Sequence, residues 1–291
     1  MIPRRVAVVV GIVGLVVAGD LAMVRLGGRY MVHAPNLQYG PIPTALEPRE
    51  QRIAVGPPAA VLSVEVGNPK LPPRATIFLL HAITDRKDHV RHWAERFNEA
   101  GYRTVLVDAR GHGRSTGEWI TYGVVESRDL SQLIDALHIE PPIGVMGVSL
   151  GGATALEWTG REPRIRSTVA LAPFASLRGI MPVFVPKVVP LIGWLVPRWT
   201  VQRIVDHAGK LAGFDPDDAN PLKAAAATKT PIMLIHGKSD NTVPYHDSEM
   251  ILDAARDHVT LVPFPGQDHD HIAGDPRLWP LVLDWFARTI P

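Results

Sequence analysis

Short apolar segments alternate with longer amphipathic segments from about residue 60 to the end of the chain. The short segments are rich in Val, Leu and Ile and mostly lack strict alternation of apolar and polar residues. This pattern is typical of strands that are buried on both faces of a parallel sheet. Seven segments have it: Ala60–Val66, Thr76–His81, Arg103–Asp108, Ile143–Val148, Ser167–Ala172, Ile232–His236 and Thr260–Phe264.

Amphipathic helices are predicted between these strands. The first of them places Val90, Trp93, Ala94 and Phe97 on one face, at helical spacing. The alternation of strands with helices predicts the α/β class, with a doubly wound and mostly parallel sheet. The predicted helices are His89–Ala100, Val124–Leu137, Gly152–Gly160, Asp247–Arg256 and Leu278–Ala287.

One long stretch, at about residues 175–229, interrupts the alternation. It separates two predicted strands and is far longer than an ordinary connection. Its first part, from Ile180 to Trp199, is strongly apolar, but four prolines and one glycine break it, so a single straight helix is excluded. We interpret the stretch as a helical cap that lies over the sheet.

The N-terminus carries a hydrophobic segment, residues 1–26. Two arginines precede an unbroken apolar run, Val6–Ala18, which alone is typical of a signal peptide. Extended to Val24, the apolar segment would rise roughly 28 Å as a helix, about the thickness of a bilayer core. An uncleaved membrane anchor and a cleaved signal segment therefore both remain open, with the anchor preferred.

The arginines before the apolar run predict that the N-terminus stays cytoplasmic and that the rest of the chain faces outward. We therefore expect an extracytoplasmic catalytic domain that is anchored in the membrane, or secreted if the segment is cleaved. Residues 27–58 are rich in Pro and Gly and are interpreted as a linker that packs on the domain edge. The catalytic domain is assigned to residues 59–291, cap included.

Composition narrows the function. A chain of 291 residues suits one large α/β domain. The formal net charge is +1, and no basic stripe is interleaved with aromatic residues, which argues against a nucleic-acid partner. There is no cysteine, so disulfides, thiolate nucleophiles and Cys-bound metals are excluded.

The strongest chemical signal is the sequence Gly-Val-Ser-Leu-Gly at residues 147–151. It follows a predicted strand and precedes a predicted helix, the context in which G-x-S-x-G forms a nucleophile elbow. The sharp turn exposes the hydroxyl of Ser149, and the helix N-terminus places a positive dipole beside it. These features predict that Ser149 is a catalytic nucleophile.

With this motif in place, the chain resembles the alpha/beta-hydrolase superfamily, in its esterase, lipase and serine-aminopeptidase-like branch. The resemblance extends roughly from Ala60 to Ile290. It implies an eight-stranded, mostly parallel sheet and a triad in the order Ser, acid, His along the chain. It also implies that the protein needs no metal or organic cofactor.

The resemblance assigns the remaining triad members. Residues 236–244 resemble the family pattern H-G-x-x-D-x-x-V-P, which makes Asp240 the acid. Gly266 and the spacing that follows it select His269 as the base, with His271 on the same loop as the alternative. The cluster Asp-His-Asp-His at 268–271 could also indicate a metal site, but no second cluster supports this reading.

Two further loops match family patterns. Residues 108–115 resemble D-x-R-G-x-G-x-S, a loop whose role is architectural, so His112 is not assigned as the base. The oxyanion hole is assigned to the backbone N–H groups of Leu150 and Ile83. The second of these lies in the sequence His-Ala-Ile-Thr-Asp at 81–85, which departs from the family's H-G-x-x-G and places Ala82 beside the donor.

The expected activity is hydrolysis of carboxylic esters, with a small-molecule or lipid-like substrate because the cap is apolar. An aminopeptidase or amidase with the same triad is an alternative, in which Asp85 or Asp88 would hold the substrate's ammonium group. A membrane-tethered, catalytically inactive binding protein on the same fold is a third possibility. The sequence does not fix the acyl chain, the physiological substrate or the oligomeric state.

Overall fold

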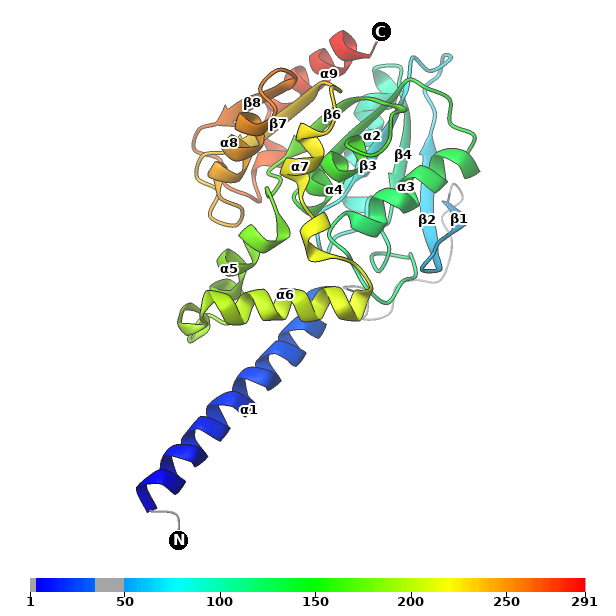
Figure 1. The fold of residues 1–291 in the computed structure, drawn as a ribbon. Coiled ribbons are helices and arrows are strands. Elements are labelled where there is room, and N and C mark those ends of the chain that lie inside the picture. The colour runs from blue at the N-terminus through cyan, green and yellow to red at the C-terminus, as the bar shows by residue number, and fades with distance from the viewer. Residues whose placement is uncertain (1–3, 35–49, 291) are drawn as a thin grey trace.

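The computed structural model describes residues 4–34 and 50–290, with residues 4–16 as backbone only. Within this part the strands form one eight-stranded sheet in the order β1-β2-β4-β3-β5-β6-β7-β8 (Figure 1). The pairs β1–β2 and β2–β4 are antiparallel, and every other pair is parallel. The strands are β1 (Glu50–Val55), β2 (Ala60–Gly67), β3 (Thr76–Leu80), β4 (Arg103–Val107), β5 (Ile143–Val148), β6 (Ile165–Leu171), β7 (Ile232–Gly237) and β8 (Val259–Phe264).

Both faces of the sheet are covered, which explains why the central strands β3 and β5 are almost free of polar side chains. On β3, Ile77 and Leu79 belong to a core formed with α2 (Arg91–Glu99) and α9 (Leu278–Thr289). Phe78 belongs to the opposite core, where its ring meets Trp158 edge-on at a centroid distance of 4.9 Å. Three helices lie on that second side: α3 (Val124–Ala136), α4 (Leu150–Thr159) and α8 (Tyr245–Ala254).

The predicted cap is present between β6 and β7 and is helical. Its apolar residues form a separate core with α1 and with the loop before α3. Prolines lie inside α5, and Gly213 ends α6 with a positive φ of 71°, as is common at a helix C-terminus. The cap consists of α5 (Leu177–Val188), η3 (Gly193–Leu195), α6 (Arg198–Ala212), η4 (Pro216–Asp218) and α7 (Pro221–Ala226).

The N-terminal segment forms the long helix α1 (Arg4–Val32). Its N-terminal part projects away from the domain, and its C-terminal end meets the domain beside α6 (Figure 1). No helix in the described part of the chain combines the length and the apolar content that a membrane crossing needs, so the predicted anchor is unsupported there. Residues 1–3 and part of the predicted linker, 35–49, lie outside the described residues, as do the side chains of residues 4–16.

One strand was not predicted from the sequence. β1 pairs antiparallel with β2 at the sheet edge, within the segment that the sequence analysis interpreted as a linker. Only Val55, its last residue, is buried. A strand with so little apolar surface leaves no periodic signal, because its stability comes from backbone pairing with its neighbour. With β1 the sheet has the eight strands that the family resemblance implied.

Candidate active site

Ser149 occupies a sharp turn between the end of β5 and the start of α4. Its backbone has φ 55° and ψ −117°, which a residue with a side chain rarely adopts. The N–H of Ser149 donates to the carbonyl of Leu171 on β6 at 2.8 Å, so the adjacent strand holds the turn in place. The strand passes directly into the helix, and the side chain is left at the carboxyl edge of the sheet, where α/β proteins bind ligands.

The two glycines of the motif are required by close backbone contacts. A Cβ at Gly147 would lie 2.2 Å from the carbonyl oxygen of Gly151, across the turn. A Cβ at Gly151 would lie 2.5 Å from the carbonyl oxygens of both Leu80 and His81, at the end of β3. These distances are far below van der Waals contact, so any side chain would push the strand and the helix apart.

His269 lies on the loop after β8 and connects two of the predicted site residues. Its Nε2 is 3.0 Å from the Oγ of Ser149, and its Nδ1 is 2.7 Å from the Oδ2 of Asp240. With Nδ1–H donating to the carboxylate, Nε2 is free to accept the serine hydroxyl proton. The loops after β7 and β8 are joined by a hydrogen bond from Ser239 N–H to the carbonyl of Gln267 at 3.0 Å, which fixes the acid relative to the base.

Asp240 follows β7, and its carboxylate is buried and well supplied with donors. Oδ1 accepts from the backbone N–H groups of Thr242 and Val243 at 2.8 and 2.9 Å. Burial opposes ionisation, but the hydrogen bonds from His236 and His269 outweigh it and hold the pKa of Asp240 below its ordinary value. The acid is therefore a carboxylate at neutral pH, as an orienting partner for imidazole must be.

His236 was not among the predicted site residues. It is fully buried at the end of β7, and its Nε2 lies 3.0 Å from the carbonyl of Val243 and 3.3 Å from Oδ2 of Asp240. The Oγ of Ser248 is 2.7 Å from Nδ1, where it donates a hydrogen bond. The pattern H-G-x-x-D contained this histidine, but sequence gives no sign that its ring turns back onto the acid four residues later.

The structure does not bring the alternative base into the site. The side chain of His271 is 77% exposed, and its Nδ1 pairs with Oδ1 of Asp268 at 2.7 Å. The four residues at 268–271 therefore do not converge on one point, since His269 turns inward to Asp240 while His271 turns outward to Asp268.

The oxyanion loop after β3 contains the second assigned donor, Ile83. The N–H of Asp85 donates to the carbonyl of Ala82 at 3.3 Å, and Thr84 has a φ of 60°, a turn position that usually takes glycine. The Nδ1 of His81 lies 2.7 Å from that same carbonyl. Because the peptide is trans, the N–H of Ile83 points to the opposite side, away from His81.

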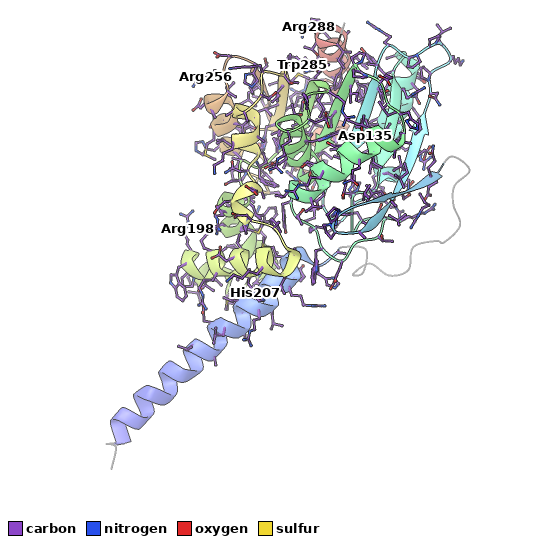
Figure 2. All side chains as sticks on the ribbon, turned by 45° about the vertical axis from the view of Figure 1, so that its right-hand side comes forward. Asp135, Arg198, His207, Arg256, Trp285 and Arg288 are labelled. Atoms are coloured by element: carbon purple, nitrogen blue, oxygen red, sulfur yellow. The ribbon has the colours of Figure 1, made fainter. Side chains whose placement is uncertain are left out.

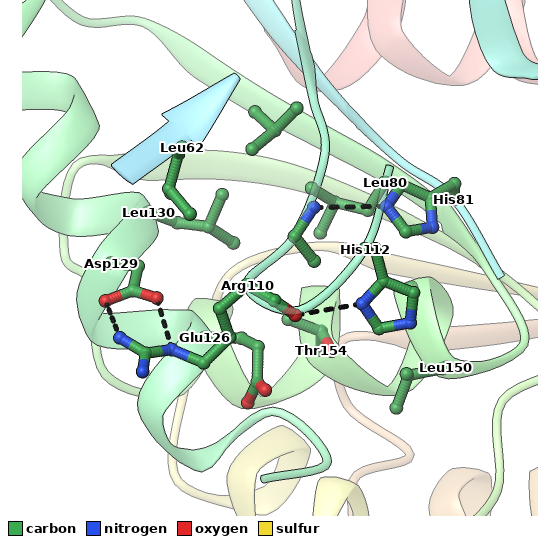
Figure 3. A pocket seen from close by; sticks show the side chains of 13 residues that line it. Leu62, Leu80, His81, Arg110, His112, Glu126, Asp129, Leu130, Leu150 and Thr154 are labelled. Carbon is green, nitrogen blue, oxygen red and sulfur yellow. Dashed lines mark hydrogen bonds and ion pairs between the residues drawn. The ribbon is translucent and has the colours of Figure 1, made fainter. Parts of the chain in front are cut away.

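Buried hydrogen bonds and an ion pair hold the loop of residues 108–115 in place. Asp108 accepts from the backbone N–H of Lys87 at 2.7 Å and from its Nζ at 2.9 Å. Arg110 forms a two-pronged ion pair with Asp129 at 2.7 and 2.8 Å, inside a small buried pocket (Figure 3). Burial lowers the pKa of His112 to about 3, so this ring is neutral at ordinary pH.

A large apolar cavity of about 570 Å³ begins at the oxyanion loop, where Ile83 and Thr84 line it. The cap supplies most of the remaining wall, for example Phe184 and Val201, and the rest comes from α1, from His33 just after it, and from Ile120 and Tyr122 in the loop before α3. The volume is typical of a small-molecule site, and the lining is almost entirely hydrocarbon. The cavity therefore adjoins the loop that follows β3, and the end of that strand lies against Gly151, two residues after the candidate nucleophile.

Comparison with known proteins agrees with this arrangement. The model of the family described as serine aminopeptidase, S33, matches residues 71–214. A monoacylglycerol lipase of Mycolicibacterium smegmatis is 29% identical over an alignment of 258 positions that covers 76% of this chain and 89% of the lipase. The chain has the fold of the alpha/beta hydrolases, and it is similar in sequence to members of that superfamily.

Solved structures show the same fold. An esterase of Pyrococcus furiosus superposes on this alpha/beta hydrolase with a TM-score of 0.66 and 22% identity, over 86% of this chain and 98% of the esterase. The family match begins within the segment before β3 and ends within the cap, just after α6. It therefore covers Ser149 and the oxyanion loop, whereas Asp240 and His269 lie beyond its end.

Proposed function

We propose that this alpha/beta hydrolase cleaves carboxylic esters with an apolar acyl group, through Ser149, His269 and Asp240. The observation that carries the proposal is the unbroken chain of contacts from the serine hydroxyl through His269 to a buried carboxylate, at 3.0 and 2.7 Å. A serine hydroxyl is a weak nucleophile by itself, and this arrangement supplies the base and the orienting group that activate it.

In the first half-reaction, Ser149 Oγ attacks the ester carbonyl carbon while its proton passes to Nε2 of His269. The carbonyl oxygen becomes an oxyanion, which the backbone N–H groups of Leu150 and Ile83 stabilise. Leu150 suits this role because it opens α4, where N–H groups have no carbonyl partner one turn earlier. His269 then gives the proton to the leaving alcohol, and the acyl group stays on Ser149.

In the second half-reaction, water takes the place of the alcohol. His269 accepts a proton from the water as it attacks the acyl carbon, the same N–H groups stabilise the second oxyanion, and the proton returns to Ser149 Oγ. The carboxylic acid leaves and the free serine is restored. Asp240 remains ionised throughout and stabilises the imidazolium that forms in each half-reaction.

The cavity supports the choice of an apolar acyl group. It adjoins Ile83, so an acyl chain that extends from a carbonyl in the oxyanion hole would enter hydrocarbon surroundings. The activity for which the mycolicibacterial relative is named, monoacylglycerol lipase, fits the same substrate class.

The geometry gives no comparable support to an aminopeptidase. Asp88 already pairs with Arg91 at 2.8 Å and with Arg86 at 3.3 Å, and Asp85 pairs with His89. Both carboxylates proposed to hold a substrate ammonium group are thus engaged by basic side chains.

The proposal is tested by hydrolysis of p-nitrophenyl esters, from acetate to palmitate, beside the matched p-nitroanilides. With the full chain, Ser149→Ala and His269→Ala should each lower kcat/KM for esters by about a thousandfold or more. His271→Ala is the matched control on the same loop and should keep wild-type activity. Absence of turnover, together with failure of a fluorophosphonate to label Ser149 in folded protein, would instead favour an inactive binding protein.

A further inference from the structure

Helix α1 forms part of the wall of the apolar cavity. Its lining residues recur at helical spacing on one face, and they include Met23, Gly27 and Met31. The neighbouring face, with Val24, Gly28 and Val32, is buried. One stripe of α1 thus packs on the protein while the adjacent stripe faces the space next to the oxyanion loop.

Close contacts with α6 fix this helix along its side. A Cβ at Gly28 would lie 2.9 Å from the ring of His207, which is labelled where α1 meets α6 in Figure 2. A Cβ at Gly27 would lie 3.2 Å from the side chain of Ile204. Farther toward the N-terminus of α1, Asp20 accepts a hydrogen bond from Thr200 at 2.9 Å and pairs with Arg203.

The end of α1 is fixed to the loop before α3. Tyr122 donates its hydroxyl to the carbonyl of Met31 at 2.7 Å, and the N–H of Ile120 donates to the carbonyl of Val32 at 2.9 Å. Tyr122 and Ile120 themselves line the cavity. The last turn of α1 and one wall of the cavity are therefore held by the same contacts.

The cavity runs from a solvent-facing rim to a buried end. Leu26 on α1 and Ile192 in the cap line it and are 70% and 53% exposed. Ile120 and Val201 line it and are 1% and 2% exposed. Residues of α1 line both an exposed part of the cavity, at Leu26, and a partly buried part, at Met31.

We propose that α1 is a specificity-determining element, and that the side chains on its cavity face set the length of the acyl chain that the site accepts. The proposal rests on the proposed ester hydrolysis for its substrate class. A bulky side chain at Met31 would fill a partly buried part of the cavity, and one at Met23 would narrow an exposed part of it. Glycine at position 27 leaves space where any larger residue would enter both the cavity and α6.

The test compares Met31→Trp and Met23→Trp in the full chain with Leu21→Trp, a control on an exposed part of the same helix that does not line the cavity. We expect Met31→Trp to lower kcat/KM for palmitate at least tenfold relative to acetate. Met23→Trp should give a smaller loss in the same direction, and Leu21→Trp should leave the profile unchanged. An unaltered chain-length profile in both cavity variants, with wild-type Tm, would overturn the proposal.

A second readout does not depend on turnover. Each tryptophan variant is placed in a Ser149→Ala background, and the binding of a fluorescent fatty acid is titrated. Met31→Trp should raise the Kd at least tenfold, whereas Leu21→Trp should not change it. Equal Kd values in all variants would refute the role of α1 even if ester hydrolysis is confirmed, and a selective loss would support it even if no ester is hydrolysed.

Discussion

Donors approach the carboxylate of Asp240 from two sides, the backbone of its own loop and the rings of two histidines. This surplus of donors explains why a buried carboxyl group keeps a low pKa. It also means that Asp240 does not titrate in the range where enzymes are assayed, so the catalytic role that we propose for it is to orient His269 and not to carry a proton.

Asp240→Asn tests this role at the residue scale. An amide keeps the shape but cannot accept from Nδ1–H of His269 as a carboxylate does, and it favours the wrong tautomer of the ring. We expect kcat for esters to fall by about a thousandfold or more, with KM nearly unchanged. Circular dichroism should be that of the wild type, and a variant with normal kcat would show that Asp240 is not the orienting group.

The sequence identified single residues where a motif enforces their geometry. The glycines of G-x-S-x-G are there because no Cβ fits, so the motif predicts the turn around Ser149. His236 escaped prediction because its contact with Asp240 depends on how a side chain folds back within a buried loop. The spacing of residues along the sequence does not indicate such a side-chain contact.

At the scale of elements, the close approach of β5 and α4 makes the elbow intolerant of side chains. Gly147→Ala would force a Cβ against the carbonyl of Gly151, whereas a Cβ at Gly274 meets no atom within 4 Å. We expect Gly147→Ala to lower the free energy of unfolding by about 3 kcal/mol or more, as measured by denaturant titration.

Gly274→Ala is the matched control, since both changes reduce the freedom of the unfolded chain equally. It should leave stability within about 1 kcal/mol of the wild type, and on the favourable side. Similar destabilisation by the two substitutions would show that the elbow is not tightly packed.

Elements were predictable in proportion to the apolar surface that they bury. Ile143–Val148 was predicted to the residue because this central strand is buried along almost its whole length. β1 was missed because only its last residue is buried. The place of α1 beside the cap was also missed, since an apolar run with no polar face shows that a helix forms but not which stripe of it packs.

For the molecule as a whole, one buried carboxylate links the sheet layer to the end of the cap. Glu157 on α4 accepts a hydrogen bond from the backbone of Asn220, at the start of α7, and pairs with Arg161 at 2.8 Å. Burial raises the pKa of Glu157 from 4.5 to about 7, and its partners offset only part of that effect.

This pKa shift predicts that the folded protein becomes less stable as the pH rises toward neutral. Between pH 4.5 and 7 the unfolded chain releases the Glu157 proton while the folded protein retains it, so the free energy of unfolding falls as pH rises. Glu157→Gln removes this dependence. Between pH 4.5 and 7, the free energy of unfolding of the variant should rise relative to that of the wild type by up to about 3 kcal/mol. Denaturant titrations of both proteins at these two pH values measure the change. A constant difference would contradict the raised pKa.

The position of α1 bears on how this alpha/beta hydrolase can diversify. The family match spans residues 71–214, whereas the cavity face of α1 lies at residues 23–31, well before it. If α1 sets the acyl length as we propose, substitutions in this short N-terminal stretch would change the substrate range and leave the catalytic machinery untouched. Two homologues with near-identical catalytic domains could then hydrolyse different substrates. A classification based on the shared domain alone would group them together.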